Sequence, residues 1–192
     1  GVLTLMTTYF SQDLGWPDTY AGMAVSLFTM LVTLFMLGVG SFAESFGLRR
    51  AVAAALLLVT AGRAFYALLP ELGGHSAAAL GAVAALLVVA AGEGILQPAC
   101  YSGVKQFTDD RTCSLGYAMI YALMNLGIVV MGAVSAWVRP GVQAILDHPA
   151  QAAGASPALN WLASFSRSGV QAVNWICFGV TATTLLGFLV FM

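Results

Sequence analysis

Long apolar segments separated by short polar ones make up almost the whole chain. None of the apolar segments alternates apolar and polar residues with the period of a barrel strand. Apolar runs of about 20 residues can cross a bilayer, where the backbone must satisfy its own hydrogen bonds and therefore forms helices. The pattern predicts an all-α membrane protein with helices at residues 1–10 (the tail of a first span), 20–43, 48–69, 77–107, 113–138 and 170–192.

The short connections between these segments alternate in charge. Segments 11–19 and 70–76 contain neither Lys nor Arg, whereas segments 44–50 and 105–112 carry basic residues, namely Arg49, Arg50, Lys105 and Arg111. Cytoplasmic connections are enriched in Lys and Arg. We therefore expect 44–50 and 105–112 to be cytoplasmic. With six spans, both ends of this integral, multi-pass chain are expected to be cytoplasmic too.

Composition narrows the class of protein further. The 192 residues are 60% hydrophobic and 8% charged, whereas about a quarter of the residues of a soluble domain are charged. The lipid bilayer is therefore the expected surrounding. A net charge of −1 provides no basic face for nucleic acid. The three cysteines are widely spaced and predict neither a disulfide framework nor a metal site. No His cluster or Ser–His arrangement indicates an enzyme, and no cofactor is expected.

Residues 139–169 are predicted to be an extracytoplasmic loop between the fifth and sixth spans. The segment is rich in Ala, Gly, Pro and Ser, and the apolar residues near its end predict one short helix at the membrane interface, namely Leu159, Trp161, Leu162 and Phe165. The chain is thus divided into residues 1–138, this loop, and a last span at 170–192. Because both ends lie inside apolar runs, we expect a fragment of a longer protein.

The segment GSFAESFGLRR, residues 40–50, resembles the connection between the second and third helices of the major facilitator superfamily. That signature reads Gly-x-Leu-Ala-Asp-Arg-x-Gly-Arg-Arg. Gly40, Gly47, Arg49 and Arg50 match it, and Glu44 stands in place of the Asp. The resemblance implies a 12-helix transporter, of which this chain would be the N-terminal six-helix bundle and the missing C-terminal bundle its partner. It also implies a gating loop, whose charge-assisted hydrogen bonds change as the bundles rock.

Three other segments resemble the proton-dependent oligopeptide transporter branch of that superfamily. GEGILQP (92–98) is similar to the branch's Gly-x-Gly-x-x-Lys-Pro motif, with Gln97 at the position of the lysine. GYAMIYALMNLG (116–127) is similar to Gly-Phe-Ser-x-x-Tyr-x-x-x-Asn-Leu-Gly, and NWICFGV (174–180) to Gly-Trp-x-x-Gly-Phe. The resemblance implies symport of small peptides or a related small polar solute, with the proton gradient as the energy source.

Glu93 is an acidic residue in the middle of the fourth apolar segment. A charge at the bilayer centre costs at least about 2.5 kcal/mol. We therefore expect its side chain to face a water-filled cavity or a partner, and to be protonated part of the time. Gln97 and Tyr101 follow at a spacing of four and share its helix face. We interpret Glu93 as the proton-coupling residue and the other two as substrate-cavity residues. The alternative is a structural acid bound to a neighbouring helix.

Arg63 is a second charge inside a predicted span. It can extend towards the membrane surface, or pair with Glu93 or with an acid on the first helix. We favour a structural or pairing role for it.

The fifth predicted helix carries three neutral polar side chains on one face, Tyr117, Tyr121 and Asn125. Tyr hydroxyls and an amide can donate and accept hydrogen bonds to a polar substrate without adding a charge. We assign them to the substrate cavity.

The sequence thus favours a proton-coupled secondary transporter that works by alternating access. Two alternatives stay open because a fold does not determine a function. One is a facilitator of another branch that moves an organic solute or a nutrient ion. The other is a transport-inactive receptor or scaffold on the same fold.

Overall fold

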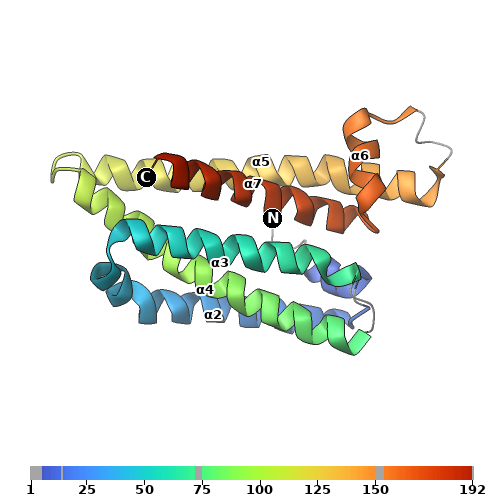
Figure 1. The fold of residues 1–192 in the computed structure, drawn as a ribbon, viewed down its shortest axis with the longest axis horizontal. Helices are drawn as coiled ribbons and strands as arrows, with labels where there is room; N and C mark the ends of the chain where they lie inside the picture. Colours follow the sequence, from blue (N-terminus) through green and yellow to red (C-terminus); the bar gives the residue numbers. More distant parts are fainter. Residues whose placement is uncertain (1–5, 14, 72–74, 150–153, 192) are drawn as a thin grey trace.

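The computed structural model describes residues 6–13, 15–71, 75–149 and 154–191, and all regular structure in these ranges is helical (Figure 1). The elements are η1 (Tyr9–Asp13, a π-helix), α2 (Asp18–Phe46), α3 (Leu48–Leu68), η2 (Leu69–Glu71, a 3₁₀ turn), α4 (His75–Phe107), α5 (Cys113–Asp147), α6 (Pro157–Phe165) and α7 (Gly169–Phe191). Among the described residues, five helices are long and apolar enough to cross a membrane, with candidate spans at Asp18–Gly38, Leu48–Glu71, Leu80–Phe107, Cys113–Asp147 and Gly169–Phe191. The described chain is all-helical, and the length and apolar character of these helices are consistent with an integral multi-pass membrane protein.

The predicted number of six spans is not reached in the described part of the chain. The expected first span, residues 1–10, is described only from Met6 onward, as one short helical stretch that continues into η1. Its aromatic residues are nevertheless packed into the bundle. Tyr9 and Phe10 are fully buried, and the Tyr9 hydroxyl donates a hydrogen bond to the Tyr66 carbonyl at 3.1 Å. The twelve-helix facilitator fold stays a prediction.

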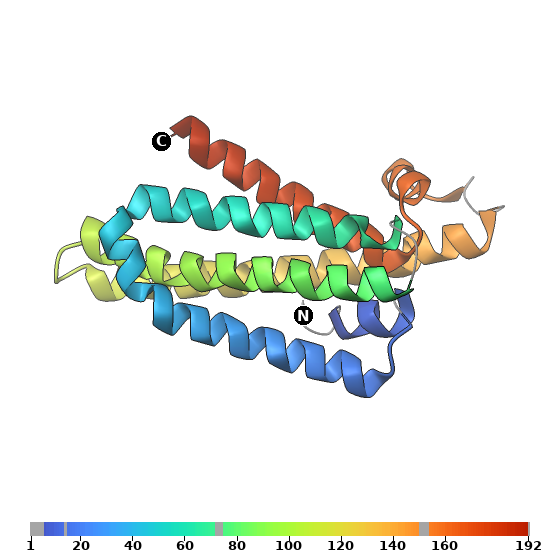
Figure 2. The same ribbon diagram turned by 60° about the horizontal axis from the view of Figure 1, so that its bottom comes forward.

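Helix α4 lies between α2 and α3 along much of its length (Figure 2). The buried core there alternates small and large side chains, including Ala82, Ala85, Leu86 and Val89 of α4 with Phe28 of α2. Small residues let helix backbones approach closely, which is how helices gain packing energy where lipid is as apolar as leucine. Helix α3 packs on α7 as well, and α7 packs on α5. The centre of the bundle is therefore α3 and α4.

Residues 44–50 are predicted to form a cytoplasmic loop, but in the structure the connection between α2 and α3 is a single residue. Gly40 and Glu44 are part of α2, Gly47 alone makes the turn, and Arg49 and Arg50 lie exposed in the first turn of α3. Gly47 has φ +84°, a conformation that glycine adopts without the steric cost other residues meet. The helix dipole disfavours cations at this helix end, so helix stability does not explain the two arginines. Their part in gating stays a prediction.

The fifth helix extends well beyond its predicted end at residue 138, so the start of the predicted 139–169 loop is wrong. Helix α5 continues through Pro140 to Asp147. Val138, Val142 and Ile145 recur on one face of this extension and are buried against Leu159 and Leu162 of α6. This contact stabilises helix in a segment whose Pro and Gly content suggests a loop. Helix α6 occupies the place of the predicted interfacial helix.

At the end of the bundle near α6, hydrogen bonds from polar side chains connect the start of α7 to the end of α3. The side chain of Gln171 is fully buried; its amide donates to the Ala67 carbonyl of α3 at 2.9 Å and its oxygen accepts from the Arg167 backbone at 2.7 Å. The Arg167 guanidinium donates to the Pro70 carbonyl at 2.9 Å. A buried polar group is tolerated when its hydrogen bonds are made. These bonds fix the start of α7 against the end of α3.

Candidate functional site: an ion pair between three helices

The triplet Gly92-Glu93-Gly94 sets the direction of the Glu93 side chain. A Cβ added at Gly92 would lie 2.6 Å from Cγ2 of Val59 and 2.9 Å from the Ala55 carbonyl oxygen, both in α3, and one added at Gly94 would lie 3.2 Å from the Val32 carbonyl oxygen of α2. Residues two apart lie about 200° apart around a helix of 3.6 residues per turn. The two glycines thus press opposite sides of α4 against α3 and α2. Glu93, between them, points in a third direction.

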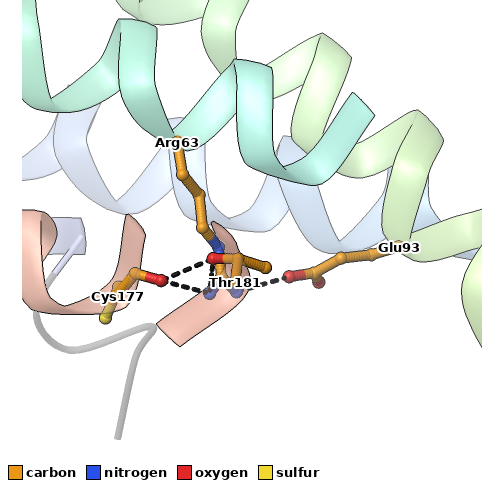
Figure 3. Close-up of polar contacts among 4 residues, drawn as sticks. All are labelled: Arg63, Glu93, Cys177 and Thr181. Atoms are coloured by element: carbon orange, nitrogen blue, oxygen red, sulfur yellow. Dashed lines mark hydrogen bonds and ion pairs between the residues drawn. The ribbon is translucent and has the colours of Figure 1, made fainter. Parts of the chain in front are cut away.

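Glu93 meets Arg63 of α3, and together they reach α7 (Figure 3). One guanidinium nitrogen of Arg63 lies 3.3 Å from Oε1 of Glu93. The other donates to the Thr181 hydroxyl at 3.3 Å and to the Cys177 carbonyl at 3.5 Å. The Thr181 hydroxyl in turn donates to the Cys177 carbonyl one turn back. One cation therefore joins a carboxylate on α4 to a hydroxyl and a carbonyl on α7.

The ion pair lies well inside the spans. At 1.5 Å per residue, Arg63 is about 22 Å from the start of α3 and about 12 Å from Glu71 at the end of its candidate span, and Glu93 is about 21 Å from the end of α4. At such a depth each charge is costly alone, and intramembrane charges pair with one another or with backbone carbonyls. Arg63 does both. The structure thus brings together the two intramembrane charges of the sequence, one of the arrangements expected for Arg63.

The Arg63–Glu93 pair is only partly buried. The side chains of Arg63 and Glu93 are 28% and 30% exposed. Within the described part of the chain, Oε2 of Glu93 accepts no hydrogen bond. The carboxylate therefore retains an oxygen that can accept a proton or a hydrogen bond from a bound molecule. A fully buried structural ion pair would not have this opening.

The other predicted cavity residues are only partly brought together. The rings of Tyr101 of α4 and Tyr117 of α5 are in contact at a tilt of 45°, with centroids 5.8 Å apart. Gln97 is half-buried on the same stripe as Glu93, and no hydrogen bond reaches its amide from any described residue. Gln97 and Tyr101 thus follow Glu93 along α4 towards the α4–α5 turn, and of the predicted α5 residues Tyr117 is in ring contact with this stripe.

Tyr121 and Asn125 lie on a part of α5 that stands clear of the bundle. Tyr121 is 66% exposed, and the Asn125 amide donates to the Tyr121 carbonyl of its own helix at 2.8 Å. Every residue from Tyr121 to Val130 is exposed. The structure does not bring these two side chains to the ion pair, and their part in a substrate cavity stays a prediction.

Sequence analysis missed the α7 partners of Arg63. Thr181 and Cys177 lie more than a hundred positions further along the chain. The available signal was Thr181 itself, a hydroxyl inside a predicted span, but α7 also carries Thr183 and Thr184. Which face meets α3 is set by tertiary packing, which the sequence pattern does not reveal.

Comparisons with protein-family models, with curated proteins and with solved structures find no match to this chain.

Replacing Gly92 by Ala is expected to destabilise the protein by about 1–3 kcal/mol, the usual cost of overfilling a packed core. The new methyl group would meet the backbone carbonyl of Ala55, which cannot yield as a flexible side chain can. Thermal unfolding in detergent micelles measures the effect. Gly127→Ala is the matched control, because an added Cβ there has no described atom within 4 Å. Equal effects for the two variants would contradict the close contact of α3 and α4.

Proposed function

We propose that this chain is the N-terminal bundle of a secondary transporter that couples proton movement to uptake of small peptides or related polar solutes. The observation that supports this most is the Arg63–Glu93 pair, which is intramembrane, partly exposed and joined to a third helix. Intramembrane ionisable residues of this kind mark ion or substrate pathways more often than passive structure. The motif resemblances to the oligopeptide branch point the same way.

Glu93 is the proton-binding group in this proposal. Protonation of its carboxylate removes the charge that attracts Arg63, which then retains only the neutral oxygens of α7. Protonation of Glu93 therefore weakens the contact of α4 with α3 and α7. The carboxylate of a peptide can then bind the Arg63 guanidinium that protonated Glu93 no longer neutralises. Gln97, Tyr101 and Tyr117 offer neutral hydrogen-bonding groups for its backbone.

A transport-inactive receptor or scaffold is the second candidate, and two observations favour it. Arg63 and Glu93 already satisfy one another, and Gln97 stands where the resembling motif has a lysine. In this case the pair only fastens α4 to α3 and α7. The two candidates differ in whether solute crosses the membrane.

Uptake of a labelled dipeptide into proteoliposomes tests the proposal. The vesicles carry the full-length protein, and an inward proton gradient is imposed. Accumulation that collapses when a protonophore dissipates the gradient supports a proton-coupled transporter. Binding of the peptide without any uptake would favour a receptor. Uptake of the peptide that is indifferent to the gradient would favour a facilitator of another branch.

A further inference from the structure

A recess with a volume of about 750 Å³ lies at the α6 end of the bundle, between the end of α3, α6 and α7. Ligand sites commonly measure about 300–1,000 Å³. The wall carries a chain of edge-to-face aromatic rings: Trp161 to Phe165 at 4.7 Å, Phe165 to Trp175 at 6.1 Å and Trp175 to Phe178 at 5.8 Å. It shares no residue with the Arg63–Glu93 pair, although its lining residues Gly179 and Val180 lie between Cys177 and Thr181, the α7 partners of Arg63.

Gly179 of α7 helps to form the recess because it has no side chain. It lines the recess, and a Cβ built on it would have no described atom within 4 Å. No close helix contact therefore requires a glycine here, unlike at Gly92. Glycine in a helix interior costs roughly 0.8–1.0 kcal/mol relative to alanine. The residue leaves open space beside Val180 and Thr183, towards the middle of the span.

Opposite charges lie side by side at the rim. Glu71 is exposed and is the one charged residue among those lining the recess. Arg167 is also exposed, and its guanidinium is held on the carbonyl of Pro70, the neighbour of Glu71, at 2.9 Å. Within the described residues the two side chains form no ion pair with each other. The rim therefore presents a separate acid and base to a molecule that carries both charges.

The occupant follows from the surroundings. A recess between the outer faces of spanning helices borders lipid chains, and an acyl chain gains little by moving from one apolar environment to another. Selectivity must therefore come from the head group. A head with adjacent ammonium and phosphate groups complements Glu71 and Arg167 through charge-assisted hydrogen bonds. Trp161, 66% exposed at the rim, is of the type enriched at membrane interfaces.

We propose that this recess binds a phospholipid whose head carries a primary ammonium and a phosphate. The ammonium group donates to Glu71, the phosphate accepts from Arg167, and one acyl chain lies along α7 at Gly179. A primary ammonium suits this site because it has N–H donors for a carboxylate. The inference does not depend on the transport function, since no residue of the ion pair takes part.

Native mass spectrometry of the full-length protein tests the site. The protein is extracted from bilayers holding equal amounts of phosphatidylethanolamine and phosphatidylglycerol. We expect the protein to retain about five times as much phosphatidylethanolamine as phosphatidylglycerol. A ratio of this size corresponds to the contribution of one partly exposed ion pair. Glu71→Gln is expected to abolish the preference. Gly179→Leu, which fills the recess, is expected to reduce retention of both lipids.

Two matched variants serve as controls. Gly187→Leu places the same side chain on the same helix at another open glycine that does not line the recess. Asp147→Asn removes an exposed acid at the same end of the bundle. Both are expected to retain lipid as the wild type does. Equal retention of the two lipids by the wild type, an unchanged preference in Glu71→Gln, or unchanged lipid retention in Gly179→Leu would overturn the proposal.

Discussion

Replacing either Arg63 or Glu93 by Gln is expected to lower the free energy of unfolding by about 2–3 kcal/mol, close to the insertion penalty of an unpaired charge at the centre of a spanning helix. Each substitution leaves its partner charged within the membrane. The loss of Arg63 is expected to be the larger of the two, because it also removes the bonds to Thr181 and to the Cys177 carbonyl.

The double variant Arg63→Gln, Glu93→Gln is expected to recover much of that loss, because no unpaired charge remains. Unfolding of the four proteins in detergent micelles gives the interaction energy of the pair. Arg49→Gln is the control: this arginine is exposed at the start of α3, and its loss is expected to change stability by less than about 0.5 kcal/mol. Purely additive single effects would mean that the pair is not coupled.

Glu93→Gln is expected to abolish gradient-driven accumulation while leaving exchange of labelled for unlabelled solute intact. A gradient of one pH unit sustains about tenfold accumulation for one proton per solute, since every 1.4 kcal/mol is a factor of ten. Glutamine can keep a hydrogen bond to the site but cannot bind and release a proton. The accumulation ratio is therefore expected to fall from about ten to about one. Tracer uptake and counterflow in the same vesicles separate the two processes.

Asp147→Asn is the control for this uptake experiment. The carboxylate of Asp147 is exposed at the end of α5, where the Gln143 amide donates to it at 3.0 Å. Its neutralisation is expected to leave accumulation unchanged. If Glu93→Gln accumulates solute as well as the control does, Glu93 has only the structural role of holding Arg63.

The positions of the long helices could be predicted from the sequence because the bilayer restricts the choice. Apolar runs bounded by polar residues predict spanning helices, and α2, α3, α4 and α7 begin and end close to the predicted bounds. The end of α5 could not be predicted in this way. Pro140 and Gly141 suggest that the helix ends there, but Val142 and Ile145 pack against α6 and keep the segment helical.

The candidate site could be predicted only in part for a similar reason. Glu93 and Arg63 are conspicuous as charges in apolar segments, and the sequence allowed their pairing among several arrangements. The contribution of α7 depends on which of its faces meets α3. Tyr121 and Asn125 share a helix face with Tyr117, yet α5 and α4 diverge from the turn that joins them (Figure 1), and both side chains are exposed. Shared periodicity predicts a common face but not what that face contacts.

Peptide-induced proton entry tests the central claim most directly. Proteoliposomes bearing the full-length protein are loaded with a pH-sensitive dye and given dipeptide outside, with no proton gradient imposed. The account predicts that wild-type vesicles acidify as peptide enters, and that Glu93→Gln vesicles, preloaded with unlabelled peptide, exchange it without any change in internal pH. Acidification in both proteins would contradict the role of Glu93. Peptide entry without acidification in the wild type would contradict proton coupling itself.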